Sequence, residues 1–364
     1  MKSAVNQAQI ARASGLSRTA VSFALNERLR TRLHPETCRR VLDKAKQLGY
    51  VPHHAARRLA RTRSDCAVAS FDQVGLIYLA PTDLDLDTPC ISMMSGAERE
   101  FSRLHASLTF IRVAQAEDWG KVERLARAGG ADGWLLYGVV DDTVVNRLRP
   151  TKLPQVVLGD HRCTRRIASA NVDCREVGRL AVQHLASLGH RRVGYVGVSS
   201  YFVYQRETLA GFRSAIKELG MDEDERLILD GSGWSHDAAF LGGVNEQKFH
   251  KWLRASDPMP TALFAPEPAT ATNLQRTLKL ANLEVPTHVS VLTCELESST
   301  AVKEGFTRII LPMSAVGREG ALLLHRIGSG LERKAVETKI APTLTEGWST
   351  CLRCDQKTIE KPAT

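Results

Sequence analysis

Apolar and polar positions repeat along this 364-residue chain with helical spacing at the start and with short strand-like runs later. Between residues 7 and 48 the spacing predicts three amphipathic helices, the third running from about Pro35 to Leu48. Their expected inward positions are Ile10, Ala11 and Ser14, then Val21, Ala24 and Leu25, then Val41, Leu42, Ala45 and Leu48. Gly15 supplies the turn backbone that a side chain would obstruct, and Ser17 can cap the second helix. Two short helices joined in this way predict a helix-turn-helix.

From residue 74 onward, short apolar runs alternate with amphipathic segments. The runs predict strands over residues 74–80, 107–113, 131–138, 154–159, 191–198, 261–266, 289–294 and 308–312. Helices are expected between them, including 92–104, 175–188, 207–219 and 269–281. This alternation predicts parallel sheets covered by helices on both faces, with room for two such sheets.

The positive charge of the chain is concentrated in its first segment. Residues 1–64 contain fourteen Lys and Arg against three acids, a net charge of +11 in a chain whose total is +9. The remaining three hundred residues therefore carry about −2. A basic helical head on a nearly neutral body indicates a nucleic-acid reader joined to a part with another task. The excess disfavours the alternative of a generic three-helix bundle whose cationic face is only solvated.

Several chemistries lack support in the sequence. It has no run of eighteen apolar residues and no signal-peptide core, so we expect a cytoplasmic protein without a membrane partner. Of eight cysteines only Cys351 and Cys354 have metal-type spacing; without a second pair, we expect reduced structural thiols, no metal and no cofactor. Glycine-rich phosphate loops, H-E-x-x-H and G-x-S-x-G are absent, so we do not expect an enzyme.

A series of motifs carries a family resemblance. The first pattern is A-x-x-A-G-V-S-x-x-T-V-S-x-x-L-N, and its matching residues here are Ala11, Gly15, Ser17, Val21, Ser22, Leu25 and Asn26. Thr37 and Val41 continue the match. The last pattern is L-G-Y-x-P-N-x-x-A-R-x-L, and its matching residues are Leu48, Gly49, Tyr50, Pro52, Ala56, Arg57 and Leu59. In this order they resemble the LacI/GalR family of bacterial transcription regulators. Residues 188–197 and 285–291 extend the resemblance more weakly, as L-G-H-x-x-I-x-x-I-G and V-P-x-D-V-S-V.

The resemblance implies the following architecture. Residues 1–51 form an all-α helix-turn-helix DNA-binding domain, and residues 52–64 form a hinge helix or linker. Residues 65–364 form an α/β effector-binding and dimerisation domain, two-lobed and similar to periplasmic binding proteins, with parallel sheets. Lobe 1 covers about 72–174 and 313–337, and lobe 2 about 175–312 and 338–354.

The same resemblance implies a DNA-binding set and a mechanism for the hinge. The set is Ser17, Arg18, Thr19, Ser22, Phe23, Asn26, Arg32, His34, Thr37, His53, Ala56, Arg57 and Leu59. Leu59 would be an apolar wedge that kinks the operator from the minor groove, although a plain basic linker is the alternative reading. Ala20, Phe23 and His53 depart from the usual residues, and the loop with Arg28, Arg30 and Arg32 is expected to hold phosphates. The operator sequence is thus poorly constrained.

The implied effector-binding residues are Asp160, Arg206, Thr208, Trp234, Glu267 and Glu295. Ordinary alternatives exist: a surface ion pair of Arg206 with Glu207 or another acid, a core position for Trp234, and a solvated loop acid at Glu295. Glu267-Pro268 stands where the family has Asn-Asp, and Gly211-Phe212 is kept without the arginine three positions earlier. An unusual sugar, a non-sugar effector and no effector all remain open.

The leading hypothesis is a sequence-specific transcription regulator, expected to act as a repressor. It would bind a pseudo-palindromic operator in double-stranded DNA as a homodimer, under the control of a small effector such as a sugar or related metabolite. The alternative is a cytoplasmic solute-sensing module whose basic head is an accessory.

Overall fold

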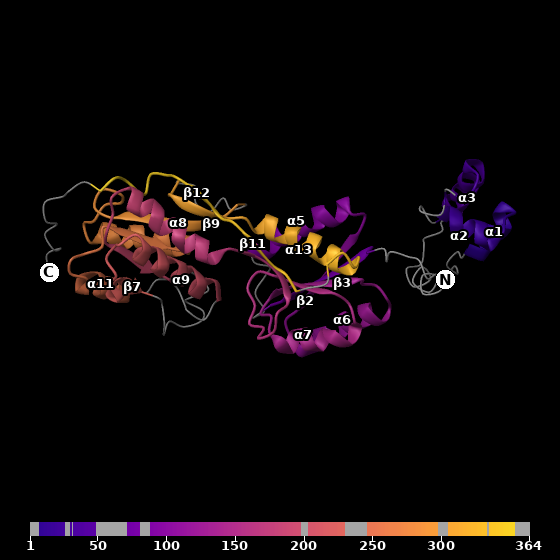
Figure 1. The fold of residues 1–364 in the computed structure, drawn as a ribbon, viewed down its shortest axis with the longest axis horizontal. Coiled ribbons are helices and arrows are strands. Elements are labelled where there is room, and N and C mark those ends of the chain that lie inside the picture. Colours follow the sequence, from indigo (N-terminus) through magenta and orange to yellow (C-terminus); the bar gives the residue numbers. More distant parts are fainter. Residues whose placement is uncertain are drawn as a thin grey trace. The chain divides into compact units, whose positions relative to one another are not determined.

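The computed structural model describes residues 7–25, 30, 32–48, 71–80, 88–197, 203–229, 246–297, 305–332 and 335–353. The chain divides into two compact units, Met1–Ala67 and Val68–Thr364, which are called the N-terminal unit and the effector unit below (Figure 1). The expected hinge, residues 52–64, lies outside the described residues.

The N-terminal unit contains three helices, α1 (Gln7–Ser14), α2 (Arg18–Leu25) and α3 (Pro35–Gln47). Their shared core consists of Ile10, Ala11, Val21, Ala24, Cys38, Val41 and Ala45. One expected inward residue is wrong, because Leu48 follows the end of α3 and is 39% exposed. Cys38, one helical turn before Val41, is buried on that face instead.

The turn between α1 and α2 is fixed by two residues that the sequence singled out. The Ser17 hydroxyl accepts a hydrogen bond from the Ala20 backbone N–H at 3.1 Å, which confirms Ser17 as the cap of α2. Gly15 has φ +67°, yet a Cβ there would meet nothing within 4 Å. The expectation that a side chain at position 15 would obstruct the turn is therefore wrong. Glycine is favoured there because the backbone is left-handed.

The effector unit contains two six-stranded sheets. The first has the order β11-β5-β4-β3-β1-β2 and is parallel throughout, with strands β1 (Gln73–Leu79), β2 (Ser107–Val113), β3 (Gly133–Gly138), β4 (Gln155–Leu158), β5 (Ala168–Val172) and β11 (Glu337–Ile340). The second has the order β12-β10-β9-β8-β6-β7, with strands β6 (Val193–Val196), β7 (Ile228–Leu229), β8 (Ala262–Ala265), β9 (Ser290–Leu296), β10 (Arg308–Leu311) and β12 (Thr343–Thr345). Only β12 among these paired strands is antiparallel.

All eight predicted strands are confirmed, and the predicted two-sheet α/β architecture is present. The chain passes between the sheets after β5, after β10 and between β11 and β12. Because β11 pairs with β5, residues 338–340 lie in the first sheet, whereas the expected lobe boundary placed them in the second. The last crossing thus falls after Ile340.

Helices follow most strands. They are α5 (Thr88–Arg103), α6 (Trp119–Arg127), α7 (Asp142–Leu148), α8 (Cys174–Ser187), α9 (Val203–Glu218), α11 (Glu246–Ala255), α12 (Pro268–Leu280) and α13 (Met313–Gly328), with short 3₁₀ turns η2 (Ala116–Asp118), η3 (Arg149–Thr151) and η4 (Glu225–Leu227). Helices α5 and α13 pack side by side on the first sheet, and α8 packs against α9 on the second (Figure 1). The four helices predicted from periodicity correspond to α5, α8, α9 and α12.

Small residues allow α8 and α9 to approach closely. A Cβ on Gly211 of α9 would lie 2.0 Å from the backbone oxygen of Arg175, and a Cβ on Gly178 of α8 would lie 2.1 Å from that of Thr208. Phe212, next to Gly211, is fully buried beside Tyr195 and Phe264. The Gly211-Phe212 pair noted in the sequence therefore serves helix packing in this fold.

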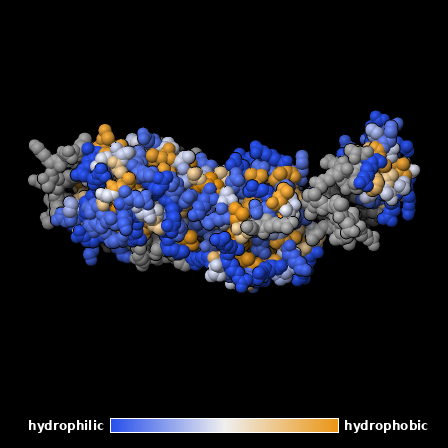
Figure 2. Space-filling model, in the orientation of Figure 1, coloured by the Kyte–Doolittle hydropathy of each residue, from blue (hydrophilic) through white to orange (hydrophobic). Residues whose placement is uncertain are grey.

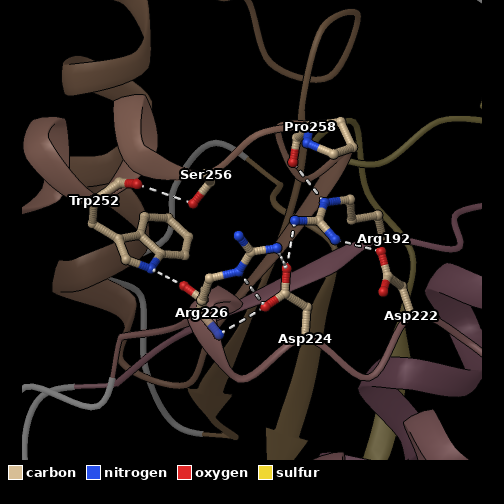
Figure 3. A network of polar contacts seen from close by, with 7 residues as sticks. All are labelled: Arg192, Asp222, Asp224, Arg226, Trp252, Ser256 and Pro258. Carbon is tan, nitrogen blue, oxygen red and sulfur yellow. Dashed lines mark hydrogen bonds and ion pairs between the residues drawn. The ribbon is translucent and has the colours of Figure 1, made fainter.

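A buried arginine joins the amino-terminal ends of β6 and β8 (Figure 3). Arg192 donates from Nε to the Pro258 carbonyl at 2.6 Å and from Nη2 to Asp224 at 2.8 Å, and it also pairs with Asp222. Arg226 holds the other side of Asp224. This network lies at the opposite strand ends from those that bind ligands in such sheets, so its role is structural.

His190 fixes the C-terminal segment on the second sheet. Its Nε2 donates to the Cys351 carbonyl at 3.2 Å, which leaves Nδ1 to accept from the Thr261 hydroxyl at 2.9 Å. The ring is buried, and this burial lowers its pKa. The histidine of the L-G-H motif thus has a structural role. Its Nε2 also contacts the Ser290 hydroxyl, which accepts a hydrogen bond from the Cys351 backbone N–H.

Most of the effector unit's visible surface is hydrophilic (Figure 2). Buried apolar side chains from the sheets and helices form its core. No helix in the described ranges is long and apolar enough to cross a membrane.

Candidate DNA-reading and effector sites

The N-terminal end of α2 presents polar side chains to solvent. Ser17, Arg18 and Thr19 are exposed, while Ser22 and Phe23 are half-buried. Arg18 and Thr19 occupy the first two helical positions after the cap, which is the part of a recognition helix that meets base edges. Their arrangement suits the predicted reading role.

A second group lies around the start of α3. Arg32 and His34 are exposed and Thr37 is half-buried. His34 is the N-cap residue of α3, but its side chain makes no capping bond. Arg30 donates from Nε to the Ala24 carbonyl at 2.9 Å, so this loop arginine ties the end of α2. The other predicted DNA-binding residues, Asn26, His53, Ala56, Arg57 and Leu59, lie outside the described residues.

The strand orders locate the candidate effector site. In each sheet the order reverses once, between β1 and β3 in the first and between β6 and β8 in the second. Ligands of open parallel sheets bind at such reversals, beyond the carboxyl ends of the strands. Near the first reversal Tyr78 and Tyr137 stack with ring centroids 5.6 Å apart, and Glu267 follows β8 at the second.

A hydrogen-bond network surrounds Glu267. Tyr204 donates from its hydroxyl to Oε1 at 2.5 Å, and Gln205 donates from Nε2 to the same oxygen at 3.0 Å. Gln205 is oriented in turn by the Tyr195 hydroxyl, which donates to its Oε1 at 2.9 Å. Burial raises the pKa of Glu267 above its ordinary value, and the two donors only partly offset this effect.

Asp160 follows β4 in the first lobe but contacts the second. It accepts from the Asn171 side chain and from the backbone N–H of Tyr204, in the first turn of α9. Burial raises the pKa of Asp160, whereas these bonds and the charge of Arg206 act in the opposite direction. The structure therefore brings Asp160, Tyr204, Arg206 and Glu267 into one region around the start of α9.

The remaining predicted effector residues lie in other surroundings. Thr208 is buried at the contact between α8 and α9, where its carbonyl faces Gly178, so the structure gives it a packing role. Glu295 is 4% exposed and pairs with Arg308 on the adjacent strand, N–O 2.8 Å, which does not fit the alternative of a solvated loop acid. Trp234 lies outside the described residues.

The ion-pair alternative for Arg206 is also only partly right. Glu207 pairs with Arg175 at 2.6 Å, and the acid whose ionised form Arg206 favours is Asp160. Sequence reasoning missed Tyr195, Tyr204 and Gln205. The signal available for them was their position, because Tyr195 lies in a buried strand and the other two precede Arg206 at a helix start.

In the described parts of the chain, the other cavity and the other polar clusters show no arrangement typical of a ligand or metal site. A cavity of about 270 Å³ lies on the second lobe and is lined by charged residues such as Arg213 and Glu225, which pair with each other at 2.5 Å. Within the described ranges, no cluster of three or more His, Cys, Asp and Glu could hold a metal ion.

Several known proteins are similar to this chain over most of its length. A family model, the periplasmic binding protein-like domain, matches residues 182–350. An HTH-type transcriptional regulator of Mycolicibacterium smegmatis is 24% identical over 91% of this chain and 93% of its own, and the regulator CelR of Thermobifida fusca is 28% identical over 86% and 89%. These relatives are transcription regulators of the helix-turn-helix type, and the family resemblance drawn from the sequence motifs agrees with them.

Solved structures show the same fold. A lac repressor dimer bound to operator and the anti-inducer ONPF has a TM-score of 0.70 at 18% identity, covering 96% of this chain and all of that one. A CelR–cellobiose complex has a TM-score of 0.63 at 22% identity, covering 95% and 99%. Similarity over nearly the whole chain to HTH-type transcriptional regulators supports a DNA-binding regulator over an enzyme or a solute sensor with an accessory head.

Proposed function

We propose that this chain is a homodimeric repressor that acts on DNA in the cytoplasm and binds a pseudo-palindromic operator under the control of a small effector. The observation that carries the proposal is the capped, solvent-facing start of α2, where Ser17, Arg18 and Thr19 stand on a unit with a large excess of positive charge. Two-fold symmetry of the dimer would present two such helices to two half-sites.

The DNA contacts divide into two kinds. Arg18 and Thr19 would meet base edges in the major groove, while Arg32 and His34, both exposed near the start of α3, would hold phosphates. In the segment outside the described residues, Leu59 would be the wedge at the operator centre, as the sequence predicts. Sequence preference would therefore come from α2 and the wedge, and much of the affinity from the arginines.

Effector control would act through the contact between the lobes. Asp160 of the first lobe holds the first turn of α9 in the second, next to Glu267. A ligand bound among these groups would bias how the lobes close, and hence how the two hinge segments of a dimer meet on DNA.

The test is selection of bound duplexes from a random pool with the full chain, followed by fluorescence anisotropy on the selected site. We expect a pseudo-palindrome and a steep fall in affinity with salt. Arg18→Ala should weaken binding to the selected site by about 1–3 kcal/mol. Arg318→Ala on α13, an exposed arginine of the effector unit, is the matched control and should have no effect. Equal affinity for random and selected duplexes at physiological salt would refute the proposal.

A further inference from the structure

Glu267 differs from ordinary buried carboxylates in how its two oxygens are used. Both hydrogen bonds, from Tyr204 and Gln205, reach Oε1. Among the described residues no group bonds to Oε2. Although Glu267 is the N-cap residue of α12, its side chain does not cap that helix. One oxygen is thus fixed in place by neutral donors, and the other is left available.

Glu267 forms no ion pair with a guanidinium among the described residues. Three other acids do lie near one: Asp160 near Arg206, Glu207 paired with Arg175, and Glu295 paired with Arg308. Burial raises the pKa of Glu267, and the hydrogen bonds from the neutral donors Tyr204 and Gln205 act in the opposite direction. Partial burial of a carboxylate without a counter-charge lowers the stability of the fold, and no positive charge among the described residues offsets this loss for Glu267.

We propose that Glu267 is the specificity-determining residue of the effector site and that it binds a protonated amine of the effector through Oε2. The proposal rests on the function proposed above and narrows the effector to a small molecule that carries an amine, such as an amino sugar or a small polyamine. Tyr204 and Gln205 act as positioning residues, because they hold Oε1 and so direct Oε2.

An amine fits this oxygen better than a hydroxyl does. Both can donate a hydrogen bond, but only the amine also supplies the missing positive charge, and charge-assisted bonds are about twice as strong as neutral ones. A carboxylate on the ligand would bring a second negative charge to the same place. The order of affinity expected from the site is therefore amine, then hydroxyl, then carboxylate.

The experiment measures binding to the full-length chain by calorimetry and thermal shift. The probes are matched triplets with one carbon skeleton and an amine, a hydroxyl or a carboxylate at one position: hexosamines, hexoses and uronic acids, and diaminobutane, butanediol and succinate. We expect the amine of at least one triplet to bind at least about tenfold more tightly than its hydroxyl counterpart. Tighter binding by neutral or anionic members, or no binding by any amine at millimolar concentration, overturns the proposal.

Two variants separate recognition from folding. Glu267→Gln keeps an oxygen for Tyr204 and Gln205 but removes the charge, so the preference for amines should fall to about threefold or less. Glu207→Gln makes the same change at an acid already paired with Arg175, and the preference should remain. An unchanged preference in Glu267→Gln refutes the role of this residue. Operator binding is measured on the same preparations, so loss of the DNA function is distinguished from a wrong effector class.

Discussion

Replacing Gly211 of α9 with alanine should force two helices of the second lobe apart. The new Cβ would lie 2.0 Å from the backbone oxygen of Arg175 and 2.7 Å from its carbonyl carbon and Cα, whereas real Cβ atoms essentially never come within 3.0 Å of such atoms. Backbone atoms cannot rotate away as a side chain would. Helices α8 and α9 must therefore separate by about 1 Å, and the contacts around them are lost.

The magnitude follows from two opposing effects. Overpacking typically costs about 1–3 kcal/mol, and the upper end applies because the obstacle is backbone. Alanine gains about 1 kcal/mol over glycine in a helix. The net loss of stability should be about 2 kcal/mol, which corresponds to a melting temperature about 3 °C lower for a unit of this size.

Tryptophan fluorescence during urea unfolding provides the assay. All five tryptophans follow residue 67, so the signal reports on the effector unit. Gly120→Ala on α6 is the matched control, because its Cβ would meet only the tip of Arg124 at 3.5 Å, and it should gain up to about 1 kcal/mol. If Gly211→Ala unfolds at the same urea concentration as the parent chain or at a higher one, the packing argument is refuted.

Three further predictions concern stability. Arg192→Met should lower the free energy of unfolding by about 2–3 kcal/mol in the same assay, because it leaves the nearly buried Asp224 with only Arg226. Burial lowers the pKa of His190, so the folded chain binds its proton less readily than the unfolded chain. The contribution of the neutral His190 to the free energy of unfolding should therefore be fully present above about pH 6.5 and should decrease as the pH falls below that value. His190→Gln should reduce this dependence of the free energy of unfolding on pH. Ser17→Ala should remove about 1 kcal/mol from α2, seen as roughly fivefold faster amide exchange in that helix; unchanged exchange would contradict the cap.

The strands that the sequence did not predict share a physical reason. β5 reads Ala-Ser-Ala-Asn-Val, with small and polar residues that form no apolar run, although four of its five positions are buried. β7, β11 and β12 are short edge strands whose residues are partly exposed. The pairing of β11 and β12 comes from the chain returning between the lobes, and nothing local in these few residues encodes that return.

The N-terminal unit was predictable because its signals are local. The cap at Ser17 and the turn at Gly15 each depend on residues within three or four positions. Leu48 is the exception. The apolar spacing predicts it on the buried face of the third helix, but the helix ends at Gln47 and Leu48 does not lie on that face. Helix ends are the least certain part of any such pattern.

The effector site was less predictable because its chemistry depends on contacts between distant residues. Whether an acid is a ligand group or half of an ion pair is decided by strand register, as where Arg308 lies opposite Thr293 and so reaches Glu295. Glu267 has no such partner, and its bonds come from a helix sixty residues earlier in the chain. The sequence identified both acids as equivalent candidates, and only the fold separates them. The helix that orients Glu267 through Tyr204 and Gln205 is held at Gly211 by its contact with α8, so we expect Gly211→Ala to disturb the ligand contact proposed for Glu267 as well.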